Sequence, residues 1–554
     1  MKFNRGIGFI GLTFIAVGGV IGSGWIFGPL ITAKIAGPAS VLSWALGGLG
    51  MLILALSYAE ISSVLPVAGG MARLPMFSHG KTTTMVMGWT AWIGYNTAAP
   101  IETIAVLDYM AAFFPWLKTS ADAQFDLSLF GMLIALILLF FFTLINAIGV
   151  NFFAKTNTLL TWFKIAIPLI IAASLIYFKF NPSNFTNYGG FMPYGWHGVF
   201  AAISGGGIVF SFIGFRHAID MAGETKSPQF IIPFALTSSL LLCLIIYEII
   251  QVAFIGALGH AQLLNGWSNV ALPDELGPLA VVVVGLGIGF LTVLLYAGAI
   301  IGPVGAALVS TGSSGRLAYA MAENELFPSY FDKLSLRAVP LRAMVLNLIV
   351  GAVVIFFVSF KEAVALNSAS IILSFSIGPI AVFTFRKQFS HIRRQFKLPF
   401  VQLFGIAGFC VASLIVYWSG WDVLVIMFGA LIIGLILFIC NIFYRRESLE
   451  DIDLKNALWI IPYLICLALI SYYGSYGGGK NYLSFPFDEL LIILLGTITF
   501  YLAVYSGLKE QDAQNYLREA QEYKEDEALS IFEEKAPFEI EIEPKSEKSE
   551  DDND

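Results

Sequence analysis

Two basic residues stand inside long apolar stretches of the sequence, where an ionisable side chain needs a partner or a task. Lys164 follows a Trp-Phe pair, and Arg216 directly precedes His217. In an apolar environment an amine can lose its proton, so Lys164 could alternate between a charged and a neutral form, as a proton-coupling site requires. An arginine stays charged there and is suited to hold a carboxylate through two parallel hydrogen bonds.

Both basic residues also have a structural interpretation. Lys164 would extend its amine toward the cytoplasmic end of its helix. Arg216 would form an internal ion pair with Asp220 or Glu224, which follow within about two helical turns. His217 is expected to pack or to form a hydrogen bond rather than to bind a ligand. The residues alone leave both interpretations of Lys164 and of Arg216 open.

Carboxylates in other apolar stretches extend the set of candidates. Glu102, Asp108 and Glu248 are secondary candidates for carrying a proton, and Glu60 is expected to be a structural pairing residue. No group of His, Cys or carboxylate residues has the spacing of a metal site, and no nucleophile–base pair can be argued. We therefore predict no catalytic residue, no metal, no cofactor and no nucleic-acid partner.

The overall composition places these few charges in a membrane. Of the 554 residues, 57% are apolar and 12% are charged, against about 25% charged in an average soluble domain. A surface with so few charges would aggregate in water, which excludes an ordinary soluble enzyme. The sequence therefore predicts an integral membrane protein whose main partner is the lipid bilayer.

The net charge of −7 belongs to the end of the chain rather than to its apolar body. Residues 509–554 hold 17 Asp or Glu against 6 Lys or Arg, whereas residues 1–508 carry a net charge of +4. We expect residues 509–554 to form an acidic cytoplasmic tail. Its first part spaces apolar residues along one helical face, which predicts a surface helix. These residues are Ala513, Tyr516, Leu517, Ala520 and Tyr523.

About 20 mostly apolar residues form a membrane-spanning helix, and the sequence has about fourteen such stretches. They centre near Val20, Leu52, Thr97, Ile137, Ile167, Ser211, Leu244, Leu295, Val350, Leu373, Ala407, Ile432, Ile465 and Leu495. Lys and Arg occur 18 times in one set of alternating connections and 5 times in the other. Since the cytoplasmic connections carry the excess, an even number of helices with both termini in the cytoplasm is predicted; counting alone also allows twelve or thirteen spans.

Two of these stretches, the first and the sixth, are interrupted by glycines. The first contains four glycines in the seven residues 18–24, and the sixth contains Gly205-Gly206-Gly207 followed by Gly214. Glycine costs about 1 kcal/mol in a helix interior, and broken helices are tolerated in a membrane where they line a cavity or bind a solute. Breaks at matched positions of two five-helix halves are typical of inverted-repeat transporters with a site at mid-membrane. Close packing of the two helices is the alternative interpretation.

Several segments resemble the amino acid–polyamine–organocation permeases. These segments are GVIGSGWIFGP (19–29), YAEISSVLPVAGG (58–70), FSFIGFRHAIDMAGETKSP (210–228), SSGRLAYAMAENELFP (313–328) and SASIILSFSIGP (368–379). The resemblance implies an all-α polytopic membrane protein of the leucine-transporter type. It divides the chain into two inverted five-helix repeats (1–180 and 181–390), additional helices (391–508) and the tail (509–554). The extra helices resemble the fourteen-helix branch that includes bacterial aspartate–proton symporters.

The same resemblance implies a substrate site at the two breaks. The α-carboxylate of an amino acid would bind the amides of residues 22–24, and its amino group would lie near backbone carbonyls of both broken helices. Lys164, in FKIAIP, matches a lysine that some proton-coupled members place where sodium-coupled relatives bind their ion. The implied substrate-binding residues, with Arg216 added from its charge, are Ile21, Gly22, Ser23, Gly24, Phe210, Ile213, Gly214 and Arg216.

We predict a secondary transporter of a bacterial cell membrane, a proton-coupled amino acid symporter that favours aspartate or glutamate. The acidic preference rests on Arg216 and on the likeness to the fourteen-helix branch, and the proton on Lys164, with Glu102 and Glu248 as weaker candidates. An exchanger of amino acids or amines is the alternative within transport. A membrane sensor, which would bind amino acids without moving them, is the alternative from another class.

Overall fold

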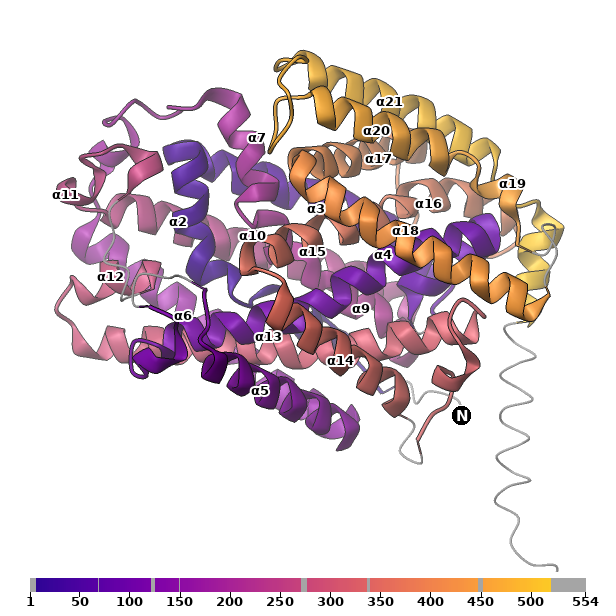
Figure 1. Ribbon diagram of the computed structural model, residues 1–554, viewed down its shortest axis with the longest axis horizontal. Coiled ribbons are helices and arrows are strands. Elements are labelled where there is room, and N and C mark those ends of the chain that lie inside the picture. The colour runs from indigo at the N-terminus through magenta and orange to yellow at the C-terminus, as the bar shows by residue number, and fades with distance from the viewer. Residues whose placement is uncertain are drawn as a thin grey trace, which may run out of the picture.

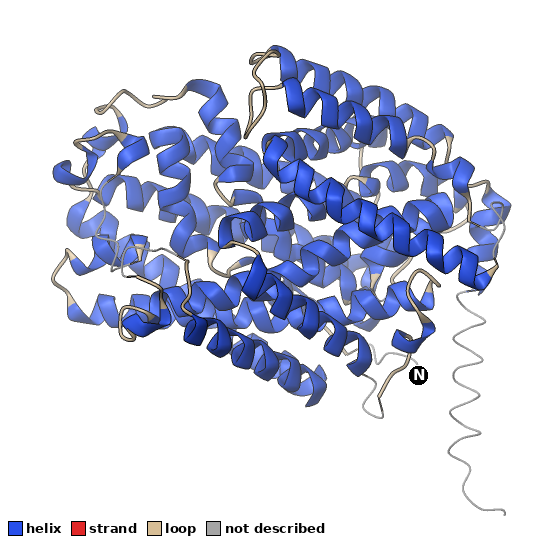
Figure 2. Ribbon diagram, viewed as in Figure 1, coloured by secondary structure: helices blue, strands red, loops and turns tan. Residues whose placement is uncertain are grey.

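Helices make up all the regular structure that can be described. The computed structural model describes residues 6–67, 69–120, 125–148, 150–270, 277–335, 339–446 and 452–519. Within these ranges the ribbon consists of α- and 3-10 helices joined by loops, and only isolated bridges are of the β type (Figure 2). The end of the predicted tail, including Ala520 and Tyr523, lies outside the described residues.

The helices follow one another in chain order (Figure 1). Residues up to 180 contain α1 (Phe9–Val20), α2 (Gly24–Ala36), α3 (Ser40–Val64), α4 (Gly70–Met110), α5 (Leu129–Ile148) and α6 (Val150–Lys179). Residues 181–390 contain α7 (Gly195–Gly205), α8 (Ile208–Phe212), η4 (Ile213–Phe215), α9 (Arg216–Asp220), α10 (Pro228–Ala257), α11 (His260–Leu263), α12 (Pro278–Val284), α13 (Gly289–Glu323), α14 (Leu341–Phe357), α15 (Phe360–Phe375) and α16 (Ile377–Gln388). The remaining helices are α17 (Val401–Trp418), α18 (Trp421–Arg445), α19 (Leu454–Ala457), α20 (Ile460–Tyr473) and α21 (Phe487–Tyr505).

The helices are those of a polytopic membrane protein. In the described ranges, ten helices are long and apolar enough to cross a membrane, or eleven if the bent pair of α7 with α8–α9 counts as one span. All fourteen predicted centres lie within helices, but α1 and α14 are shorter apolar helices. The all-α polytopic fold is therefore confirmed, and the number fourteen stays a prediction.

Proline sets several helix ends, because it lacks an N–H and restricts the residue before it. The long helix α3 ends at Val64, two residues before Pro66, and α10 begins with Pro228. Pro340 directly precedes α14. These are positions at which the sequence predicts connections between spans.

Helices at corresponding positions of the two predicted repeats pack against each other. The helix α3 packs along α10, α4 along α13, and α5 along α14. The predicted boundaries at residues 180, 390 and 508 all fall between helices. This pairing agrees with two five-helix repeats, although the repeat boundaries themselves remain a prediction.

The helices after residue 391 form a layer beside the first ten spans. The helices α20 and α21 lie side by side (Figure 1), and α21 packs against α17. Beyond α21, residues 510–519 are helical. Ala513 is buried there, and the Tyr516 hydroxyl donates to Asp453 Oδ2 at 2.5 Å. The predicted surface helix is thus present over its described part, with its apolar face against the body.

Candidate functional site

The first broken helix loses its regular hydrogen bonding between α1 and α2. The amide of Ile21 still donates to Val17 O, but Gly22 N turns to Val20 O, and Ile21 has φ −81° and ψ 84°. Ile21, Gly22 and Ser23 thereby connect two helices whose facing ends carry backbone groups without a partner in their own helix. The free amides belong to the N-terminus of α2, where the helix dipole favours a negative charge.

The carboxylate of Glu102 already occupies one of these amides. Its Oε2 accepts a hydrogen bond from Ser23 N at 2.8 Å, and both residues are buried. Its Oε1 lies against Gly22 so closely that a Cβ on that glycine would overlap it. Glu102 comes from the C-terminal part of α4, so a residue far away in the sequence caps the second half of the broken helix.

The amine of Lys164 binds the other half of the same break. Lys164 projects from α6, is buried, and donates from Nζ to the carbonyl of Gly18 at 2.5 Å. Asn157 and Thr161, on the same face of α6, both donate to Phe14 O at 3.3 Å. Lys164 and Glu102 lie close enough for their charges to attract each other. Lys164 therefore binds the backbone of the broken helix, and its role in proton coupling stays a prediction.

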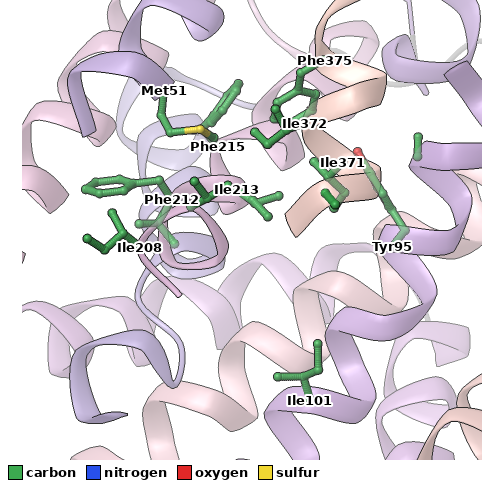
Figure 3. Packing of buried hydrophobic residues seen from close by; sticks show 14 of the residues in the cluster. Met51, Tyr95, Ile101, Ile208, Phe212, Ile213, Phe215, Ile371, Ile372 and Phe375 are labelled. Carbon is green, nitrogen blue, oxygen red and sulfur yellow. The ribbon is translucent and has the colours of Figure 1, made fainter. Parts of the chain in front are cut away.

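The second broken helix bends by 48° between α7 and α8–α9. Gly207 has φ +78°, a left-handed conformation that glycine adopts without the penalty of a Cβ. The backbone groups here are satisfied locally, since Gly206 N donates to Ala202 O and Ser211 N to Gly207 O. Figure 3 shows the apolar side chains around α8 and η4, among them Phe212, which is fully buried.

Glycines let the two broken helices touch. A Cβ on Gly19 would overlap the ring of His217, and a Cβ on Gly214 would overlap the backbone of Gly19. A Cβ on Gly24 would overlap the side chain of Ser211. Both interpretations of the glycines are thus compatible with the contacts, because the same residues break the helices and allow them to pack closely.

Arg216 begins α9, which follows the second break. Its guanidinium stacks on the ring of Tyr95, 3.8 Å from the centroid, and the Tyr95 hydroxyl donates to Asp220 Oδ2 at 2.8 Å. Within the described residues its Nε and Nη1 have no hydrogen-bond partner although the side chain is buried. His217 shares a hydrogen bond with Ser313 Oγ at 2.7 Å, as expected of a structural histidine.

The remaining carboxylates are separate from the breaks. Asp108 pairs with Lys118 Nζ at 2.9 Å, which makes it a structural residue. Glu248 is half-buried on α10, and its Oε1 has no partner among the described residues. No described contact brings Glu248 to Lys164 or to Glu102. Glu60 pairs with Arg386 at 2.7 Å, as expected. In the described ranges no three His, Cys, Asp or Glu side chains could hold a metal ion.

Comparison with known proteins decides the family. The family model described as amino acid permease matches residues 7–440. The chain belongs to the amino acid permease family. It is 34% identical to the glutamate/serine transporter AimA of Bacillus subtilis (strain 168) over 94% of this chain and 96% of that protein. It is 33% identical to the aspartate-proton symporter of the same organism, over 92% and 97% of the two chains. The branched-chain amino acid permease BcaP of B. subtilis is 26% identical over 81% and 94%.

At its first break this permease holds a carboxylate on an amide and an ammonium on a carbonyl. This arrangement can bind a proton at Glu102 or release one from Lys164, and either event changes which backbone groups are free. The two charged side chains at the break come from α4 and α6, which belong to the same predicted repeat as the break itself. At the first break, the ionisable side chains Glu102 and Lys164 thus come from neighbouring helices, and the backbone groups they bind come from the broken helix.

Some residues that contact the first break are not identified from the sequence. Tyr247 donates from its hydroxyl to Val20 O at 2.7 Å, and Asn157 and Thr161 bind α1 beside Lys164. Asn157, Thr161 and Lys164 are spaced by four and three residues, which places them on one helical face. That polar spacing in an apolar stretch is a signal that could have identified them. A lone buried tyrosine such as Tyr247 gives no such signal.

Proposed function

We propose that this permease is a proton-coupled symporter of amino acids that favours aspartate and glutamate. The observation that carries the proposal is the hydrogen bond from Ser23 N to Glu102 Oε2 at 2.8 Å. It places the permease's own carboxylate on an amide that, by resemblance to the family, would receive the α-carboxylate of a substrate.

Two carboxylates cannot share this amide while both are ionised, because like charges repel strongly in a buried site. A proton on Glu102 removes its charge, weakens the bond to Ser23 N and frees the amide for the substrate. The proton and the amino acid then enter the site together. This coupling follows from competition for one hydrogen-bond donor.

Lys164 has a complementary task in this mechanism. Its amine donates to the carbonyl of Gly18, and the charge of Glu102 attracts it. When Glu102 becomes neutral, Lys164 loses its neighbouring negative charge, and the incoming α-carboxylate of the substrate replaces it. The net charge around the first break is therefore the same before and after the proton and the substrate bind. Glu248 has no such neighbour among the described residues, so we leave it out of the coupling mechanism.

The acidic preference has two supports. The relatives named as a glutamate/serine transporter and an aspartate-proton symporter match nearly the whole chain. Arg216 supplies two buried N–H groups without a partner among the described residues, and buried guanidinium groups bind carboxylates well. We further propose that both termini face the cytoplasm, as the distribution of Lys and Arg indicates.

Transport by the purified full chain in proteoliposomes tests the proposal. With an alkaline interior, labelled aspartate should accumulate above its external concentration and should do so without internal amino acid. Glu102→Gln should lose this accumulation but keep counterflow, because a neutral side chain no longer excludes the substrate at acidic or alkaline pH. Asp108→Asn, on the same helix but paired with Lys118, is the matched control and should accumulate aspartate normally.

Three results would overturn the proposal. Aspartate uptake that needs amino acid on the opposite side, with or without a pH gradient, identifies an exchanger. If Glu102→Gln accumulates aspartate in a pH gradient as well as the unmodified permease does, Glu102 has no part in the coupling. Binding of aspartate without any flux points to a sensor.

A further inference from the structure

The connection between α16 and α17 carries an unusual concentration of positive charge. Residues 386–397 include five Lys or Arg and one His, and no Asp or Glu occurs between Glu362 and Asp422. We refer to residues 387–397 as the basic loop. It directly precedes α17, one of the helices that is long and apolar enough to cross the membrane.

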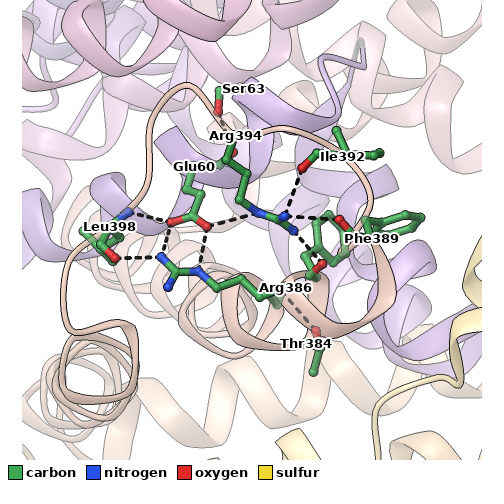
Figure 4. Close-up of polar contacts among 10 residues, drawn as sticks. Glu60, Ser63, Thr384, Arg386, Phe389, Ile392, Arg394 and Leu398 are labelled. Atoms are coloured by element: carbon green, nitrogen blue, oxygen red, sulfur yellow. Dashed lines mark hydrogen bonds and ion pairs between the residues drawn. The ribbon is translucent and has the colours of Figure 1, made fainter.

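A buried ion cluster fixes the shape of the basic loop (Figure 4). Glu60 accepts hydrogen bonds from Arg386 Nε at 2.9 Å and Nη2 at 2.7 Å, and it pairs with Arg394 Nε at 3.4 Å. Its Oε2 also accepts from the backbone amide of Leu398 at 2.7 Å. Arg394 Nη2 donates to Phe385 O at 2.7 Å. One carboxylate thus fastens both ends of the loop to α3.

The other basic side chains of the loop point outward and have no acidic partner among the described contacts. They are Lys387, His391, Arg393 and Lys397, all exposed. Ile392 and Phe396 alternate with them and are half-buried. The first residues after the loop are exposed and apolar, with Phe400 79% and Leu403 66% accessible.

We propose that the basic loop is a binding surface for anionic phospholipid headgroups. Lys387, Arg393 and Lys397 supply cations for phosphodiester oxygens, while Phe400 and Leu403 lie where the acyl chains begin. A cluster of four or more Lys or Arg beside a membrane helix is typical of such recognition. The cluster at Glu60 keeps the surface in place, since it holds the loop without using the three outward cations.

The acidic end of the chain is the alternative ligand for the basic loop. Residues 520–554 hold 14 Asp or Glu against 4 Lys or Arg. The Gln388 amide donates to Leu508 O at 2.8 Å, so the tail helix of residues 510–519 begins beside the loop. The lipid is favoured because the apolar residues that follow the loop continue onto the exposed face of α17. A bilayer covers these residues and the cations together.

Lipid binding by the full chain tests the proposal through a variant and a matched control. The variant K387Q/R393Q/K397Q removes the three outward cations and keeps the cluster at Glu60 that holds the loop. The control K226Q/K333Q/K455Q removes three exposed lysines from other connections on the same predicted side. Native mass spectrometry measures the affinity for dioleoylphosphatidylglycerol, with dioleoylphosphatidylcholine as the zwitterionic reference. Hydrogen exchange in nanodiscs of both compositions locates the binding.

We expect the loop variant to bind phosphatidylglycerol about a hundredfold more weakly, at about fivefold per charge, and phosphatidylcholine equally well. The control variant should bind both lipids as the unmodified chain does. Amides of residues 387–397 should exchange more slowly with phosphatidylglycerol present, and the loop variant should lose this protection. Equal affinity in the loop variant, or protection independent of lipid, overturns the proposal. Lipid binding that begins only after residues 520–554 are deleted also overturns it, because the tail is then the occupant.

Discussion

The two broken helices differ in what holds them together. At the first break, side chains of three other helices bind the exposed backbone: Glu102 accepts from Ser23 N, Lys164 donates to Gly18 O, and Tyr247 donates to Val20 O. At the second break the backbone of residues 204–212 is satisfied mainly by its own neighbours. No charged side chain bonds to that backbone among the described contacts.

This difference separates two functions that one would otherwise assign to both breaks. A break held by charged side chains can respond to protonation, because the strength of its contacts depends on charge. A break held by local backbone bonds and a glycine with positive φ is a bend whose shape does not depend on pH. We infer that the first break couples transport to the proton, whereas the second break sets the bend between the two halves of its helix.

The largest expected effect comes from removing the amine of the first break. Lys164→Ala deletes the donor to Gly18 O and leaves Glu102 without its neighbouring positive charge. We expect pH-driven accumulation of aspartate in proteoliposomes to fall to the level of simple equilibration. The matched control is Lys179→Ala, at the C-terminal end of the same helix α6. Normal concentrative uptake by Lys164→Ala would contradict a proton role for this lysine.

Alanine at one glycine of each break compares the two directly. In Gly22→Ala the new Cβ overlaps Glu102 Oε1, so the charge-assisted bond to Ser23 N is lost. A hydrogen bond of this kind contributes about 1.5–3 kcal/mol, and we expect a loss of about 10–100-fold in pH-driven uptake. In Gly207→Ala no atom lies within 4 Å of the Cβ, and only the left-handed backbone opposes it, at about 1–2 kcal/mol.

Gly207→Ala should therefore lower the melting temperature while its remaining uptake keeps the normal dependence on the pH gradient. Gly22→Ala should show the reverse pattern, with a larger loss of coupling than of stability. A thermal-shift measurement beside the uptake assay separates the two patterns. If both variants lose coupling to the same extent, the two breaks do not differ in function.

Much of this arrangement can be predicted from the sequence because it depends on local composition. Apolar length fixes the helices, and glycines fix where two of them break. The basic residue Lys164 is conspicuous in an apolar stretch for the same reason, since few charges occur there. Each of these signals lies within one segment of the chain.

The sequence does not show which residues from different segments contact each other. From the sequence, Glu102 is a weaker candidate than Lys164, because no pattern of residues around Glu102 indicates a contact with Ser23. For Arg216 the sequence offers an internal ion pair with Asp220 or Glu224 as one of two interpretations, whereas its guanidinium stacks on Tyr95 of α4. Glu224 instead pairs with Arg316 at 3.8 Å. Such contacts depend on how helices pack, which periodicity alone does not determine.

A smaller and selective effect is expected at Arg216, beside the second break. Arg216→Ala removes the buried guanidinium that stacks on Tyr95. If it attracts a side-chain carboxylate, uptake of aspartate should weaken about tenfold more than uptake of serine, as expected for about 1.4 kcal/mol of a charge-assisted hydrogen bond. Competition between labelled aspartate and unlabelled serine measures this ratio. An equal loss for both substrates would assign Arg216 to the packing with Tyr95 and Asp220.

The smallest expected effect tests a neutral contact that the two breaks share, and so separates the role of charge from that of hydrogen bonding. The Tyr247 hydroxyl lies 2.7 Å from Val20 O at the first break and 3.4 Å from Ser211 O at the second. Tyr247→Phe removes both contacts but keeps the ring stacked on Trp44. We expect a loss of about fivefold in uptake, since a neutral hydrogen bond contributes about 1 kcal/mol, with no change in pH dependence. Tyr58→Phe is the matched control, a buried tyrosine whose hydroxyl lies 3.4 Å from Ser374 O, away from both breaks. A change of pH dependence in Tyr247→Phe would mean that neutral contacts also carry the coupling, and the distinction between charged and uncharged breaks would fail.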